Sequence, residues 1–173
     1  MQVQAQPEEP HIRHTDAIHP LPLLTGLTAL LMGALIYMTD RPPQTAWLVH
    51  ALCGNLAVYG KLPPLFGALG NVLPAFLHVL AFSLITAGVM VQDKKTYAWI
   101  TLFWFCVNAL FELGQKFPDT VVPWIARGSS GSHLLARTTN FFSKGTFDPL
   151  DILAFAMGAF MAYALLIVMH KKE

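Results

Sequence analysis

Four long stretches of apolar residues constrain this chain more than any other feature of its sequence. They cover residues 21–38, 70–91, 97–115 and 150–169. A helix that crosses the roughly 30 Å hydrocarbon core of a bilayer needs about 20 predominantly apolar residues, and each stretch is close to that length. In lipid, every backbone polar group must be bonded within its own segment, so we expect each stretch to be a helix. The sequence therefore predicts an all-α, polytopic membrane helix bundle with four transmembrane helices.

The composition agrees with lipid as the solvent. Hydrophobic residues make up 54% of the 173 residues and charged residues only 12%, whereas soluble domains carry roughly 25% charged residues. So few ionised side chains cannot cover the surface of a soluble globule. This argues against a soluble enzyme, a disordered chain and a nucleic-acid-binding protein, which would need a basic face. The formal charge of +1 and the two cysteines point to no partner and no metal site.

Three further segments complete the predicted organisation. Residues 1–20 form a polar N-terminal segment ahead of a membrane domain over residues 21–169. The apolar stretch 46–60 lies between two proline pairs and is shorter than a span, so we predict a short interfacial or re-entrant helix there. Residues 116–147 form a long loop with a Gly/Ser run and a short apolar patch. Connections of this length are usually functional or flexible.

The orientation is predicted from the lysines that lie close to the ends of the spans. Lys94 and Lys95 occupy a four-residue turn, and Lys171 and Lys172 follow the last span. Short cytoplasmic segments carry an excess of Lys and Arg, so both termini are expected in the cytoplasm. The 116–147 loop would then be extracytoplasmic.

Polar residues from several parts of the sequence are expected to meet on one side of the membrane. His78 lies near the start of the second span, Glu112 and Gln115 near the end of the third, and Asp148 and Asp151 at the start of the fourth. Successive spans alternate in direction, so these positions share one face of the bilayer, which the lysines predict to be extracytoplasmic. The sequence therefore predicts a polar site at that face.

Several of these residues also have a purely structural interpretation. Asp148 followed by Pro149 is typical of a helix start, where the carboxylate caps the first turn. His78 could be a core histidine that bonds a neighbouring helix, and Gln115 could form an interhelical hydrogen bond. Glu112 is the hardest to explain structurally, because an ionisable residue within a span is costly and is a functional-site candidate by default.

Asp151 is expected to face protein. It shares a helical stripe with Ala154, Gly158 and Ala162, at four-residue spacing. Small residues at this spacing allow membrane helices to approach closely. Asp151 could therefore belong to a site inside the bundle, or complement the positive end of the helix dipole.

Three elements of this sequence resemble the VanZ-like family of small bacterial membrane proteins. They are His78, the Glu-Leu-Gly-Gln sequence at 112–115, and Phe-Asp-Pro-Leu-Asp-Ile-Leu at 147–153. The similarity extends over about residues 74–166, although Pro74 and Ala75 stand where members often carry an Asp-Lys pair. It implies a bacterial inner-membrane protein linked, in the founding members, to the cell envelope and to glycopeptide tolerance. It implies no reaction.

The first functional hypothesis is a membrane site that binds or processes an anionic envelope molecule or lipid-linked molecule. Glu112, Asp151 and His78 would act as acid and base or hold a divalent cation, and the sequence does not choose between these roles or identify a cofactor. The residues expected to bind the anionic ligand are Gln115, Asp148, Lys144, Arg137 and Arg127.

Two other functions remain open at this stage. The chain could be a structural or assembly subunit of a membrane complex, with the polar cluster locking the bundle and the 116–147 loop docking a protein partner. It could also be a proton-linked transporter, because intramembrane Glu, Asp and His residues form proton relays. The polar groups gather at one face, however, which does not favour a path across the bilayer.

Overall fold

The computed structural model describes residues 18–40, 61, 63–90, 93–127, 138–139, 141–143 and 145–171. Its long helices are α1 (Pro20–Asp40), α3 (Leu69–Val89), α4 (Lys94–Lys116) and α7 (Pro149–His170), and α5 (Pro118–Arg127) is shorter. The four long helices have the length and composition needed to cross a membrane. The predicted all-α bundle with four spans is confirmed within these ranges, and the chain is a multi-pass membrane protein. The predicted short helix at 46–60 lies outside the described residues.

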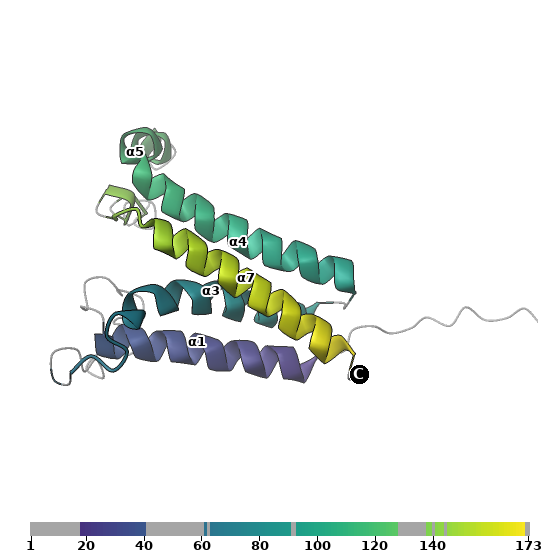
Figure 1. Cartoon of the computed structure of the whole chain (residues 1–173). Coiled ribbons are helices and arrows are strands. Elements are labelled where there is room, and N and C mark those ends of the chain that lie inside the picture. Colours follow the sequence, from purple (N-terminus) through teal and green to yellow (C-terminus); the bar gives the residue numbers. More distant parts are fainter. Residues whose placement is uncertain are drawn as a thin grey trace, which may run out of the picture.

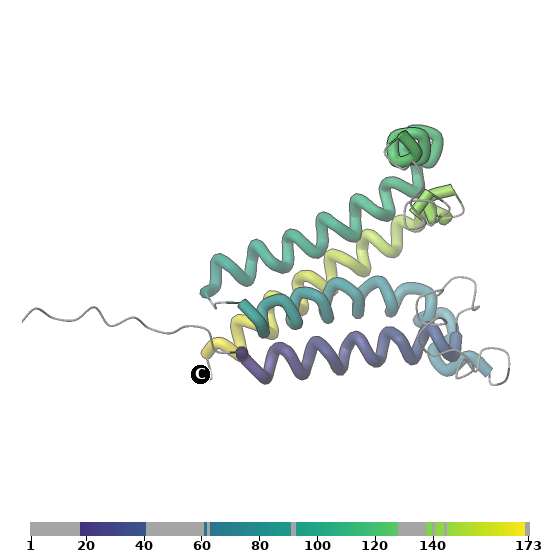
Figure 2. Tube along the Cα trace, turned by 180° about the vertical axis from the view of Figure 1, so that it is seen from behind, coloured from purple at the N-terminus to yellow at the C-terminus, as the bar shows by residue number. Residues whose placement is uncertain are grey.

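Helix α3 occupies the centre of the bundle. It packs against α1, α7 and α4, and α4 also packs against α7 (Figure 1). The ends of α1 and α4 lie at the same end of the bundle as the starts of α3 and α7, as Figures 1 and 2 both show. We call this the polar end, because it carries Asp40, Glu112 and Asp148. The opposite end, with Pro20 and His170, is called the far end.

Helices α1 and α3 approach closely at two glycines. A Cβ atom on Gly26 of α1 would lie 2.9 Å from the carbonyl oxygen of Ala81, and one on Gly88 of α3 would lie 2.8 Å from the backbone nitrogen of Leu23. Each helix therefore presents a glycine to the backbone of the other. This arrangement maximises van der Waals contact where no hydrophobic effect drives association.

Helix α7 meets α3 along the predicted stripe of small residues. Ala154 and Ala162 are buried, with 2% and 0% of their surfaces exposed. A Cβ atom on Gly158 would lie 2.5 Å from the carbonyl oxygen of Phe76. The predicted close approach along this stripe is confirmed, and it sets the distance between α7 and the central helix.

Candidate functional site

Glu112 joins the end of α4 to the start of α7. Its side chain is buried, with only 5% of its surface exposed. Oε1 accepts a hydrogen bond of 2.6 Å from the backbone N–H of Asp148, and Oε2 accepts one of 3.2 Å from Nε2 of Gln115. Burying a carboxylate is costly unless hydrogen bonds compensate it, and both oxygens of Glu112 have a partner. We call these two hydrogen bonds the Glu112 latch.

Asp148 begins α7 as the sequence predicts. It is the N-cap residue, and its Oδ1 accepts a 2.9 Å hydrogen bond from the backbone N–H of Leu150. Pro149 occupies the first helical turn, where it leaves no backbone donor unsatisfied. Asp151, also in the first turn, is half-buried at the positive end of the helix dipole. The predicted cap is confirmed, and Asp148 participates in the site through both its side chain and its backbone.

The segment before α7 packs onto the last turn of α4. The ring of Phe142 is stacked on that of Phe111, with centroids 5.7 Å apart. A Cβ atom on Gly114 would lie 2.5 Å from a ring carbon of Phe142. Gly145 lies against the side chain of Gln115. The backbone N–H of Gly145 donates a hydrogen bond to the carbonyl oxygen of Phe141. Small residues therefore let this segment approach closely enough for Glu112 to reach the backbone of Asp148.

One described cation, Lys116, lies beside the Glu112 latch. The Nζ of Lys116 lies 5.0 Å from the ring centroid of Phe147 and 5.9 Å from that of Phe117. Arg127 is exposed at the end of α5. Of the predicted anion-binding cations, Arg137 and Lys144 lie outside the described residues. The sequence reading assigned no role to Lys116, because its position next to an aromatic ring depends on how the 145–148 segment folds back.

His78 lies further from the polar end than the other predicted site residues, and its side chain is exposed. It is nine residues from the start of α3, about 13 Å along the helix axis, whereas Glu112 is four residues from the end of α4, about 6 Å. Its ring packs against Phe82, with centroids 4.6 Å apart, and Phe82 stacks on Trp104. Among the described residues, no hydrogen bond joins His78 to Glu112 or Asp148.

Asp40 is a polar-end residue whose role was not predicted from the sequence. Its carboxylate accepts hydrogen bonds of 3.0, 2.8 and 3.1 Å from the backbone N–H groups of Leu65, Phe66 and Gly67. It therefore ties the end of α1 to the turn that leads into α3. The available signal was an acidic residue directly after the first span, but Asp40 also belongs to the sequence Thr-Asp-Arg-Pro-Pro at 39–43, which is typical of the end of a helix.

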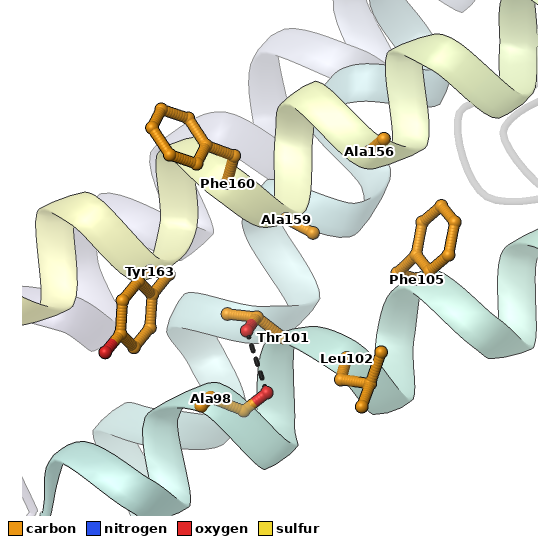
Figure 3. Close-up of a pocket in the computed structure, with 8 residues that line it drawn as sticks. All are labelled: Ala98, Thr101, Leu102, Phe105, Ala156, Ala159, Phe160 and Tyr163. Carbon is orange, nitrogen blue, oxygen red and sulfur yellow. Dashed lines mark hydrogen bonds between the residues drawn. The ribbon is translucent and has the colours of Figure 1, made fainter.

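The described residues lack a cluster of metal-binding side chains. No group of three or more His, Cys, Asp or Glu residues within the described ranges could hold a metal ion. A groove of about 360 Å³ lies between α4 and α7, and Figure 3 shows that its lining is mostly alanines and apolar side chains, with the hydroxyl-bearing Thr101 and Tyr163. Ala98 and Tyr163 place it in the half of the bundle nearer the far end. The groove is therefore separate from the Glu112 latch.

Fold and site together define a class: a multi-pass α-helical membrane protein whose polar end is held by buried and capping carboxylates. No family model matches the sequence, and neither the curated proteins nor the solved structures include one that is significantly similar to it.

Proposed function

We propose that this chain is a VanZ-like protein of the bacterial inner membrane that binds an anionic envelope molecule or lipid-linked molecule. In this proposal both termini are cytoplasmic, the polar end faces outward, and the ligand's anionic group binds beside the Glu112 latch. Lys116 and Arg127 provide the positive charge, together with Arg137 and Lys144.

The observation that carries the proposal is the placement of Lys116. Its ammonium lies next to Phe147, one residue before the Asp148 backbone that Glu112 holds. A cation–π contact is worth about 0.5–1 kcal/mol at an exposed site, which favours one position of the side chain. A cation–π contact needs no hydrogen-bond acceptor, so the N–H donors that point away from the ring can bind the oxygens of an anion.

The hydrogen bonds of Glu112 favour binding over acid–base chemistry. Both of its oxygens accept bonds from neighbouring groups. A carboxylate used in this way holds the ligand-binding segment in place and has no oxygen directed at a reacting group. In this proposal Glu112, Gln115 and Asp148 are positioning residues, and the cations contact the ligand.

The proposal is tested by native mass spectrometry of the protein released from gently solubilised membranes. We expect a bound anionic lipid or lipid-linked molecule on the wild type, and its loss from the Lys116→Gln/Arg127→Gln variant. The Lys94→Gln/Lys95→Gln variant is the matched control, because it removes the same charge at the far end. Equal retention by all three proteins, or a ligand lost only from the control, would contradict the proposal.

The Glu112 latch also favours a second function, that of a structural or assembly subunit. A buried carboxylate whose two oxygens are bonded within the chain stabilises the bundle whether or not a ligand binds. In that case the same spectra would show a second polypeptide, retained by the wild type and by both charge variants, and no small anionic ligand.

A further inference from the structure

Helix α5 has an unusual direction and position. It follows α4 after a single residue, Phe117, and it runs across the direction of the four spans, so that it is seen end-on in Figures 1 and 2. It lies at the polar end, beyond the last turn of α4. None of its ten residues is buried. A helix in this position lies parallel to the surface of the bilayer that the spans cross.

The two sides of α5 differ in character. Val121, Val122 and Ile125 are half-buried, whereas Thr120 and Arg127, seven residues apart and on one side of the helix, are exposed. Trp124 lies three residues after Val121 and four after Thr120, at the boundary between these sides. It is 76% exposed, although it is the largest apolar side chain of the helix.

Exposed aromatic side chains follow α4 along its length, at Trp99, Phe103 and Phe111, and continue at Phe117 directly after it. Trp99 is 70% exposed near the far end of this helix, and Phe117 is 55% exposed directly after its last residue. Phe117 is 18 positions after Trp99, a rise of about 27 Å, close to the roughly 30 Å of the hydrocarbon core. Aromatic side chains, Trp and Tyr above all, gather at both membrane interfaces. The interface at the polar end therefore falls where α5 begins.

We infer that α5 is an interfacial helix that lies in the surface of the bilayer, with the Trp124 indole among the phospholipid headgroups and glycerol groups. This region suits an indole, which has an apolar body and an N–H that needs a polar partner. One acidic residue, Asp119, and one basic residue, Arg127, balance the charge of α5. The contact is therefore apolar and forms with zwitterionic lipid. The inference does not depend on the proposed function.

The test is fluorescence quenching of the full chain reconstituted in phosphatidylcholine vesicles. Bromine atoms are placed on the lipid chains either near the glycerol or near the chain ends, and iodide is added to the buffer in a separate series. The contribution of Trp124 is obtained as the difference between the wild type and Trp124→Phe. Trp99→Phe gives the matched difference for an exposed tryptophan of a span.

We expect the Trp124 difference signal to be lost mainly with bromines near the glycerol, and less with deep bromines or iodide. Quenching by iodide with no effect of either brominated lipid would place α5 in water and overturn the inference. So would a signal that neither quencher reduces, since Trp124 would then be covered by protein. Because Trp124 is exposed, Trp124→Phe should leave the helical circular dichroism unchanged.

Discussion

Oε1 of Glu112 lies 2.6 Å from the backbone nitrogen of Asp148, which is 36 residues further along the chain. At the same end of the bundle, Oδ2 of Asp40 lies 2.8 Å from the backbone nitrogen of Phe66. In both cases a carboxylate near the end of one span accepts a hydrogen bond from a backbone N–H group just before another span begins. The pairs of spans are α4 with α7 and α1 with α3. The N–H of Asp148, the N-cap of α7, has no partner within its helix, and the N–H of Phe66 lies in the turn before α3. The same kind of hydrogen bond, from a backbone N–H group to a carboxylate, therefore joins both pairs of helices at the polar end.

Removing the Glu112 carboxylate should destabilise the contact between α4 and α7. Glu112→Ala leaves the N–H of Asp148 and the amide of Gln115 without this acceptor, which costs about 1–3 kcal/mol. Glu112→Gln keeps one acceptor oxygen and should cost less. Thermal unfolding in mild detergent measures both changes, with Asp119→Asn as a control on an exposed carboxylate. A Glu112→Ala variant as stable as this control would show that the latch contributes nothing.

Substitutions of Asp40 should destabilise the contact between α1 and α3, and more so the fewer acceptor oxygens the new side chain has. Its two carboxylate oxygens accept hydrogen bonds from three backbone N–H groups. Asp40→Asn keeps one acceptor oxygen and Asp40→Ala keeps none, so the melting temperature should fall from wild type to Asn to Ala. Protease cleavage within 61–67 should become faster in the same order. Cleavage that stays at the wild-type rate in Asp40→Ala would contradict a role in holding this turn.

Gly158 should tolerate no side chain, because it lies against the backbone of α3. A Cβ atom there would be 2.5 Å from the carbonyl oxygen of Phe76. Gly158→Ala forces the helices apart, and overpacking of this kind costs about 1–3 kcal/mol.

Gly33→Ala is the matched control for Gly158→Ala. Its Cβ would lie 3.8 Å from the Cβ of Leu77, an ordinary contact. Ala is favoured over Gly in a helix by about 1 kcal/mol, so this variant should be as stable as the wild type or more stable. Similar melting temperatures for the two variants would show that contact with the α3 backbone is not the reason why glycine is required at position 158.

Asp93, outside the spans at the start of α4, should make the stability of the fold depend on pH in the acid range. The Thr96 hydroxyl donates to Oδ2 and the N–H groups of Thr96 and Lys95 donate to Oδ1, which together hold the pKa of Asp93 below its ordinary value. The charged form is thus favoured in the folded state. Its contribution is present above the unfolded pKa and is lost as the pH falls through the folded pKa.

Carboxyl-carbon NMR of the labelled protein measures this pKa. Thr96→Val removes the hydroxyl donor and should move the pKa of Asp93 back up towards its ordinary value. Asp93→Asn should flatten the dependence of the melting temperature on pH in the acid range. A pKa that is unchanged in Thr96→Val would assign the shift to the backbone donors alone.

The long helices could be predicted because each span must satisfy its own backbone in lipid, which leaves a run of about 20 apolar residues. The meeting of Glu112 with the start of α7 followed from alternating helix directions, and the cap at Asp148 from its proline neighbour. The partner of Glu112 could not be predicted, because every non-proline residue has a backbone N–H group and the residue type does not show which one acts as the donor. Asp40 was missed because the polar and proline-rich sequence at 39–43 is already explained as the end of the first span.

Helix α5 was not predicted because its sequence contains two prolines, Pro118 and Pro123, within a long loop. Pro118 occupies the first helical position, where proline is well tolerated, and Pro123 needs the support of its surroundings. The apolar patch in this loop was recognised, but the direction of the segment depends on how α4 ends. Likewise, the position of Lys116 beside Phe147 depends on the path of residues 145–148, which local sequence does not encode.

The hydrogen bonds of Asp40 and Glu112 each lie within one pair of helices, which permits assembly pair by pair during synthesis. Asp40 needs only α1 and the turn before α3, and Glu112 needs only α4 and the start of α7. Each helical hairpin can thus bond its own polar end as soon as its second helix has been made. The chain can leave the insertion machinery as two closed pairs, and the contact of Gly158 with Phe76 then joins them in the lipid.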